Sequence, residues 1–240
     1  MCVSGTKVAY SAEGIEFIGT VFAPAGSGPA PGVLVAHESP GVTEHTLDAA
    51  RRLAGMGFVA MATDYQGGGQ VVTDRDEMMR RFQAFLADPG SIRARMSAAL
   101  EALKAQSRVD SGRLAAVGYC YGGAAAIELA RSGADLKAAV GYHSTLTTAR
   151  PQDATQIRCP VLVHIGADDP VIPVEQRTAF QAEMTAAGVD WRLVLYGRTG
   201  HSFTNPEADG WGRPGFAYSA AADRRSWVAT QDLFAEVGLT

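Results

Sequence analysis

One cysteine, Cys120, lies in the stretch of the chain whose residue types and spacing point most directly to covalent chemistry. Residues 114–126 form an apolar run, then Gly-Tyr-Cys-Tyr-Gly-Gly, then a helical pattern that begins with small residues. The flanking glycines, Gly118 and Gly122, remove side chains that would collide where a strand turns sharply into a helix. That turn places the thiol at a helix N-terminus, which favours the thiolate. We therefore interpret Cys120 as a nucleophile for acyl transfer rather than a buried structural cysteine.

The other two cysteines, Cys2 and Cys159, lack such a setting. Cys2 lies near the N-terminus, and Cys159 precedes Pro160 at the edge of a predicted strand. We interpret both as structural or incidental. Three cysteines with no close pair do not suggest a disulfide framework, and reduced thiols fit a reducing compartment.

A cysteine nucleophile needs a base within hydrogen-bond reach, and three histidines follow it in the sequence. His164 falls in the middle of a predicted strand, where its side chain would be committed to packing. His143 ends a strand and could approach the site. His201 lies in Gly-Arg-Thr-Gly-His-Ser-Phe, a loop after the last predicted strand. Because functional side chains are concentrated on such loops, we favour His201 as the base and keep His143 as the alternative.

The base in turn needs an orienting carboxylate, and two aspartates compete for that role. The predicted strand 161–165 leads into Gly-Ala-Asp-Asp-Pro-Val-Ile-Pro (166–173). The pattern Gly-x-x-Asp-x-x-x-Pro selects Asp169, and Asp168 is the alternative. Both could instead be turn-forming residues. As the acid, Asp169 would hold the imidazole tautomer and stabilise the charged ring.

A loop after the predicted strand 32–37 would lie beside the cysteine turn, since ligands bind at the carboxyl ends of parallel strands. It contains Glu38, Ser39 and Pro40. An oxyanion hole would use the backbone N–H groups of Tyr121 and Ser39, because Pro40 has no N–H to donate. Glu38 is unusual there, since a carboxylate beside a thiolate disfavours charge on both groups. Taken alone, it is most simply an exposed glutamate.

Short apolar runs alternate with longer helical patterns along the chain. This alternation favours an α/β fold with a mostly parallel sheet and helices on both faces. The predicted strands are 15–22, 32–37, 58–63, 114–118, 138–142, 161–165 and 192–196. The predicted helices are 46–56, 75–87, 91–106, 121–131, 174–187 and 217–237, with Pro89-Gly90 as the stop before the third. At this length we expect residues 1–240 to form a single domain.

Composition excludes several classes of function. Net charge is −4, and no basic run suggests nucleic acid. No apolar run has the length of a signal peptide or a membrane span, so we expect a cytoplasmic protein with no membrane partner. The histidines lack metal-ligand spacing, and no Gly-x-Gly-x-x-Gly follows a strand, so we expect no metal and no cofactor. No obligate protein partner is evident.

Four of these motifs, taken in order, resemble the dienelactone hydrolase family of α/β-hydrolases. They are Gly-Tyr-Cys-Tyr-Gly-Gly, His-Glu-x-x-Gly, Gly-Ala-Asp-Asp-Pro-Val-Ile-Pro and Gly-His-Ser-Phe. The resemblance implies an α/β-hydrolase fold and a Cys120–His201–Asp169 triad that hydrolyses an ester or lactone through an acyl-enzyme. It also implies that Glu38 pairs with the resting thiol and releases it when substrate binds.

The chain departs from the family at the substrate carboxylate, which well-known members hold with two arginines. Asn205 stands where one arginine is expected, and Arg80 or Arg81 could match the other. We therefore expect these three residues to contact substrate, with dienelactone itself in question. A thioesterase or a promiscuous small-ester carboxylesterase would use the same triad. A non-catalytic ligand-binding protein of this fold is a third possibility, but it should have lost part of the triad.

Overall fold

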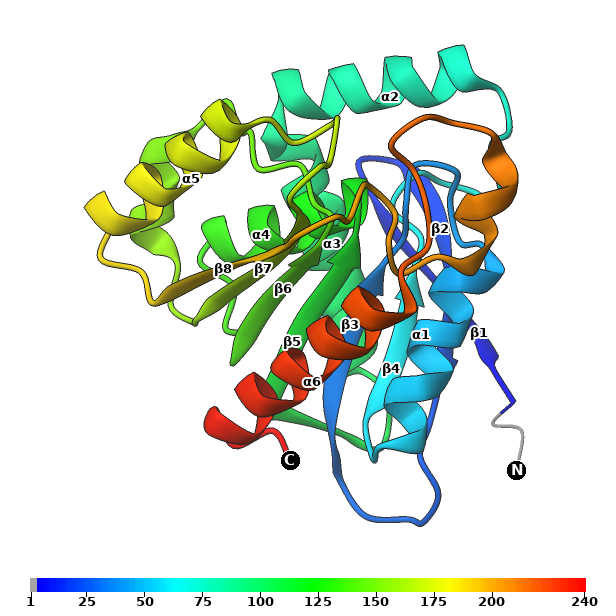
Figure 1. Ribbon diagram of the computed structural model, residues 1–240. Coiled ribbons are helices and arrows are strands. Elements are labelled where there is room, and N and C mark those ends of the chain that lie inside the picture. Colours follow the sequence, from blue (N-terminus) through cyan, green and yellow to red (C-terminus); the bar gives the residue numbers. More distant parts are fainter. Residues whose placement is uncertain (1–3) are drawn as a thin grey trace.

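Within residues 4–240, which the computed structural model describes, eight strands form one sheet in the order β1-β2-β4-β3-β5-β6-β7-β8 (Figure 1). The strands are β1 (Thr6–Ala12), β2 (Ile15–Phe22), β3 (Ala30–Ala36), β4 (Val59–Thr63), β5 (Val109–Tyr119), β6 (Ala138–Tyr142), β7 (Val161–Gly166) and β8 (Trp191–Tyr196). Strand β2 pairs antiparallel with β1 and β4, and the remaining neighbours pair in parallel. The predicted mostly parallel sheet is confirmed.

Helices cover both faces of this sheet, as predicted. They are α1 (Glu44–Gly55), α2 (Arg75–Ala87), α3 (Pro89–Lys104), α4 (Tyr121–Arg131), α5 (Val174–Ala186) and α6 (Ala220–Glu236), with short 3-10 helices η1 (Pro151–Gln156) and η2 (Pro206–Trp211). Helices α1 and α6 pack on one face, and α3, α4 and α5 pack on the other (Figure 1). Helix α2 lies over the carboxyl ends of the parallel strands, so it can form one wall of a site there.

The strands at the centre of the sheet are buried on both faces, which explains their sequences. All seven residues of β3 and all five of β6 are buried, and they are mostly Ala, Val, Leu and Gly. Helix α4 is buried over its whole length. It approaches the sheet closely because its first turn is small; a Cβ atom on Gly123 would stand 2.6 Å from the Cβ of Ser144.

Strand β1 was not predicted from the sequence. Its residues alternate between exposed and half-buried, so it lacks the apolar run that marks the central strands. It joins β2 through a two-residue turn, Glu13-Gly14, in which both residues have positive φ angles of 53° and 75°. Such a turn matches the twist of a hairpin, and a residue pair ending in glycine is its usual signal.

The predicted starts of α3 and α6 were wrong. Helix α2 ends at Ala87, as predicted, but α3 begins at Pro89 rather than at Ser91, and the Asp88 side chain accepts a hydrogen bond from the Gly90 N–H at 2.9 Å. Proline is well suited to this position, where its missing N–H would have no partner in the helix. Helix α6 begins at Ala220 rather than at residue 217, after the capping residue Ser219.

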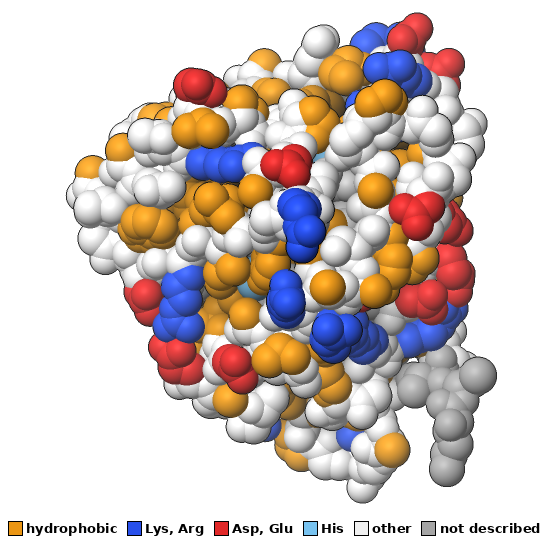
Figure 2. Space-filling model, viewed as in Figure 1, with side chains coloured by type: hydrophobic (Ala, Val, Ile, Leu, Met, Phe, Trp, Pro, Cys, Tyr) orange, Lys and Arg blue, Asp and Glu red, His pale blue; other side chains and the backbone are white. Residues whose placement is uncertain are grey.

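Charged side chains of both signs are interspersed with apolar ones on the face shown in Figure 2. Across residues 4–240, none of the helices is both long enough and apolar enough to cross a membrane. Cys2 lies outside the described residues. Cys159 is buried in the core against the α4 side of the sheet, and burial raises the pKa of its thiol to about 12.

Candidate active site

The turn between β5 and α4 holds Cys120 in a backbone conformation that few side chains adopt, with φ 54° and ψ −117°. The flanking glycines make this turn possible. A Cβ atom on Gly118 would stand 2.0 Å from the carbonyl oxygen of Gly122, and one on Gly122 would stand 2.3 Å from the carbonyl oxygen of Ala36. Strain of this kind is concentrated at functional sites. The turn presents the sulfur at the carboxyl end of the sheet.

Two further side chains, from the loops after β7 and β8, form a chain of contacts that ends at this sulfur. The Nε2 atom of His201, in the loop after β8, lies 3.1 Å from Cys120 Sγ. Its Nδ1 atom lies 2.8 Å from Asp169 Oδ2, in the loop after β7. The other carboxylate oxygen of Asp169 accepts the Val171 N–H at 2.8 Å, which fixes its orientation. Asp168 is exposed, so the structure brings together Cys120, His201 and Asp169.

The alternative histidines are engaged elsewhere. The His143 ring packs edge-on against the His201 ring, with centroids 5.1 Å apart, and its Nε2 lies 2.8 Å from Thr204 Oγ1. His164 is bound to the hydroxyl groups of Tyr196 and Thr230. His143 therefore packs against the His201 ring without contacting the sulfur as a base. His164 is part of the packed interior.

The charge state of His201 follows from its surroundings. Burial opposes protonation of the ring, but the Cys120 sulfur and the Asp169 carboxylate outweigh it and raise the pKa of His201 to about 10. The ring is therefore protonated at neutral pH. An imidazolium 3.1 Å from sulfur favours the thiolate, which is the nucleophilic form.

Glu38 is buried at 5% exposure, so its interpretation as a surface residue was wrong. Its Oε2 accepts a hydrogen bond from Asn205 Nδ2 at 2.8 Å and lies 3.2 Å from His45 Nδ1, while Ser202 Oγ donates to Oε1 at 3.4 Å. Burial raises the pKa of Glu38, but the charges of His45 and His143 and the hydrogen bond from Asn205 together outweigh burial and bring the pKa down to about 2. Among the described residues no hydrogen bond joins Glu38 to Cys120, although both line one cavity of about 240 Å³.

A cavity of about 130 Å³ opens onto the sulfur. It includes Ser39 and Tyr121, whose backbone N–H groups were predicted to form the oxyanion hole. Tyr121 is the first residue of α4, where a backbone N–H has no partner within the helix. The remaining walls are mainly apolar, with two arginines: Arg75, Met78, Met79, Phe82, Val171, Arg213 and Phe216.

The predicted substrate contacts are not in this cavity. Arg80 is exposed and paired with Glu77, and Arg81 is paired with the same glutamate while it lines a separate cavity beside Gln66. Asn205 is bound to Glu38 and faces away from the sulfur. Both arginines lie on α2, the expected helix, but neither faces the cavity at the sulfur.

The arginines that do line the cavity were missed. Arg75 is the first residue of α2, and Arg213 follows η2 with its guanidinium 3.8 Å above the Phe216 ring. Burial and the charge of Arg75 lower the pKa of Arg213. Neither guanidinium forms an ion pair with any residue in 4–240. No motif surrounds either residue, so the sequence offered no signal for them.

Comparisons with known proteins agree on one family. The sequence model of the dienelactone hydrolase family matches residues 17–238. A carboxymethylenebutenolidase of Pseudomonas putida is 28% identical over 219 residues, which cover 88% of this chain and 90% of that protein. A Methylorubrum extorquens protein, provisionally named a carboxymethylenebutenolidase, is 31% identical and covers 90% of this chain and 75% of its own. The crystal structure of a dienelactone hydrolase-like promiscuous phosphotriesterase from metagenomic libraries superposes with a TM-score of 0.93, at 41% identity and 99% coverage of both chains.

Proposed function

The chain belongs to the dienelactone hydrolase family and is a hydrolase, and from this premise we propose that it cleaves an ester or lactone through an acyl-enzyme on Cys120. One observation carries the proposal: His201 Nε2 lies 3.1 Å from Cys120 Sγ while its Nδ1 lies 2.8 Å from Asp169. A nucleophile, a base and an orienting acid in one chain of contacts is the arrangement that acyl transfer needs.

In the first step, the thiolate attacks the carbonyl carbon and a C–S bond forms as the carbonyl π electrons move to oxygen. We assign the stabilisation of that oxyanion to the backbone N–H groups of Tyr121 and Ser39, because both residues line the cavity at the sulfur. When the intermediate collapses, the C–O bond breaks and the leaving alkoxide takes the proton from His201. The products are a thioester on Cys120 and an alcohol, which stays tethered to the acyl group if the substrate is a lactone.

In the second step, water hydrolyses the thioester. Neutral His201 takes a proton from water, and the hydroxide attacks the acyl carbon. The thiolate leaves with the electrons of the C–S bond, and the carboxylic acid is released. Asp169 keeps the imidazole in the tautomer whose Nε2 can accept that proton.

The cavity favours a small substrate that carries an anionic group. Arg75 and Arg213 bring two positive charges that the protein itself leaves unpaired, and a guanidinium binds a carboxylate through paired hydrogen bonds. Met78, Phe82 and Phe216 offer an apolar wall for the rest of the molecule. We therefore propose a lactone or small ester with a free carboxylate.

A second candidate substrate is a phosphotriester. The relative at 41% identity is described as a promiscuous phosphotriesterase, and it covers 99% of the chain. The same thiolate would attack phosphorus, expel one alkoxide, and be released by water. Thioesters and simple esters are also within reach of this triad, because the leaving group needs only the proton of His201.

The test is a Cys120→Ala variant, with Cys159→Ala as the matched control because Cys159 is buried in the core. Cys120→Ala should lower kcat/KM by several orders of magnitude without unfolding the protein. Mass spectrometry of acid-quenched wild type should show the acyl mass on the peptide that contains Cys120. A folded Cys120→Ala protein with near-normal activity would refute the mechanism.

A further inference from the structure

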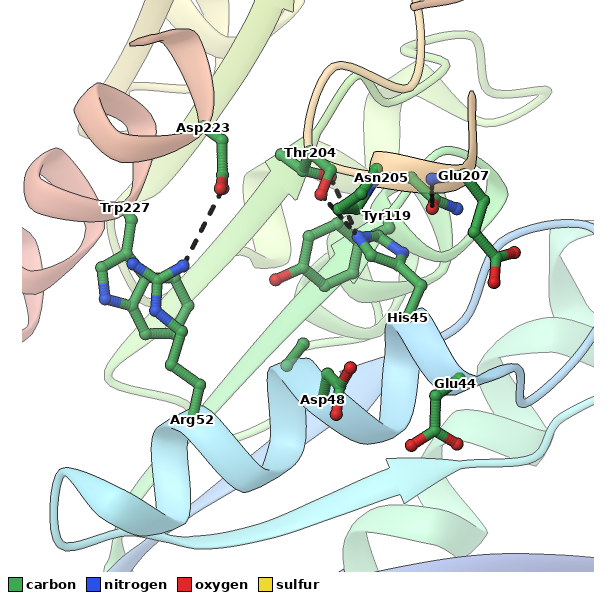
Figure 3. Close-up of a pocket in the computed structure, with 12 residues that line it drawn as sticks. Glu44, His45, Asp48, Arg52, Tyr119, Thr204, Asn205, Glu207, Asp223 and Trp227 are labelled. Atoms are coloured by element: carbon green, nitrogen blue, oxygen red, sulfur yellow. Dashed lines mark hydrogen bonds and ion pairs between the residues drawn. The ribbon is translucent and has the colours of Figure 1, made fainter. Parts of the chain in front are cut away.

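We propose that His45 is a positioning residue: as an imidazolium it holds the Glu38 carboxylate away from Cys120, so that a histidine outside the substrate cavity controls the nucleophile. The inference deepens the proposed function, and it rests on Cys120 being the nucleophile. His45 lies on α1 and faces a second cavity of about 330 Å³, which Asn205 also lines (Figure 3).

The contacts of both His45 ring nitrogens favour a protonated ring. Its Nε2 lies 3.2 Å from the Thr204 carbonyl oxygen, and its Nδ1 lies 3.2 Å from Glu38 Oε2. The carbonyl oxygen can only accept a hydrogen bond, so it favours a proton on Nε2. The Nδ1 contact with Glu38 is an ion pair without hydrogen-bond geometry, and the charge of the carboxylate favours a proton on that side of the ring. The Thr204 hydroxyl, also 3.2 Å from Nε2, has a nearer partner in His143 Nε2 at 2.8 Å.

Two uncharged side chains also donate hydrogen bonds to the Glu38 carboxylate. Asn205 Nδ2 donates to the same Oε2 atom that faces His45, at 2.8 Å. Ser202 Oγ donates to Oε1 at 3.4 Å. Only His45 in this set can carry a charge. If the ring became neutral, a buried carboxylate would remain without a compensating cation, which is an unfavourable state.

Other charged or titratable groups face His45 from several elements. They are Glu44, Asp48 and Arg52 on α1 itself, Glu207 on η2, Asp223 on α6 and Tyr119 at the end of β5 (Figure 3). Arg52 is 3.8 Å from Asp223 and stacks on the Trp227 ring, so its charge is already engaged. Burial lowers the pKa of His45, but Glu38, with smaller contributions from the Thr204 carbonyl and Asp223, outweighs burial and raises the pKa.

Loss of the His45 proton changes the charge beside the nucleophile. Glu38 and Cys120 line the same cavity, so an uncompensated carboxylate there disfavours the thiolate. The lower-energy arrangement keeps the proton on sulfur and lets S–H donate to Glu38. The reactive state is therefore present below the raised pKa of His45 and is lost as the pH rises through it.

The experiment measures the rate of Cys120 alkylation by iodoacetamide between pH 6 and 10, with the modified peptide identified by mass spectrometry. His45→Gln keeps a donor toward Glu38 but removes the charge. It should slow alkylation at pH 7 about tenfold or more, since one unit of thiol pKa is tenfold in thiolate. The double variant Glu38→Gln/His45→Gln should return to within about twofold of Glu38→Gln alone, because the carboxylate through which His45 acts is gone.

Asp48→Asn is the matched control, since Asp48 lines the same cavity but pairs with Arg51 rather than Glu38. It should leave alkylation unchanged. The wild-type profile gives an independent test that needs no folded His45 variant: the rate should fall toward high pH, and Glu38→Gln should abolish that fall.

Three results would overturn the proposal. They are a His45→Gln rate within twofold of wild type at every pH, a slow His45→Gln that Glu38→Gln does not restore, or a wild-type profile without a descending limb. Alkylation reports on the thiol without any ester. A protein that alkylates as expected but hydrolyses no ester would refute the proposed function and leave the role of His45 standing.

Discussion

The catalytic cluster and the rim of its cavity are built from different parts of the molecule. Cys120, His201 and Asp169 follow the ends of adjacent or nearby parallel strands, and the latter two are almost fully buried. Arg75 and Arg213 stand on α2 and on the segment after η2, outside the sheet. The reacting atoms are therefore held by the most tightly packed elements. We call the segments that carry Arg75 and Arg213 the rim of the cavity. Their sequences can change without disturbing the sheet, and they carry the groups that would recognise a substrate.

This difference predicts that the smallest change at the strand ends has a large effect. Gly122→Ala would place a Cβ atom 2.3 Å from the Ala36 carbonyl oxygen, and neither backbone segment can move freely. We expect a loss of about 3 kcal/mol of stability and a loss of most activity, because the turn that presents Cys120 must shift. Thermal unfolding and kcat/KM for a small ester measure both effects.

The matched control is Gly210→Ala on η2, where a Cβ atom would meet nothing within 4 Å. It should change stability by less than about 0.5 kcal/mol and leave kcat/KM near wild type. Equal changes of stability and of kcat/KM in the two variants would contradict the proposed difference between the packed strand ends and the rim.

The same contrast explains what could be predicted from sequence. The central strands were found because burial on both faces demands continuous apolar runs, whereas β1, at the edge, carries no such run. Cys120, His201 and Asp169 were located because each lies in a short motif at a strand end. The strand order brings the ends of β5, β7 and β8 near one another, so it also brings these three residues near one another.

The rim could not be predicted in this way. Arg75 and Arg213 line one cavity because α2 and the segment after η2 both lie over the strand ends. The residues around each arginine form no motif that would predict this placement. The same holds for the partners of Glu38. His45 and Asn205 come from opposite ends of the chain, so a motif around Glu38 could suggest its presence at the site but not which way it turns.

The second prediction concerns Arg213, and its effect should be intermediate. Arg213→Gln removes one of the two unpaired charges that line the cavity but keeps donors of similar reach. A hydrogen bond to a charged group contributes about 1.5–3 kcal/mol, so kcat/KM for a carboxylate-bearing ester should fall tenfold or more. The value for the matched methyl ester should change little. Equal losses for both substrates would show that Arg213 supports the fold of the rim rather than the recognition of an anion.

The smallest expected effect comes from Arg81, which shares helix α2 with Arg75 but faces away from the sulfur cavity. Its guanidinium donates to Glu77 at 2.8 Å, and both partners are about one third exposed. Pairs of this kind four residues apart on a helix stabilise a protein by only about 0.3–0.5 kcal/mol. Arg81→Gln should therefore shift the unfolding midpoint slightly and keep the ratio of kcat/KM between the charged and neutral esters within about twofold of wild type. Both variants remove one positive charge, so a comparison with Arg213→Gln separates direct contact from long-range attraction, which salt screens beyond roughly 10 Å. A tenfold change in the ratio for Arg81→Gln at 0.1 M salt would mean that substrate reaches the cavity beside Gln66 and that the rim extends further along α2 than the sulfur cavity does.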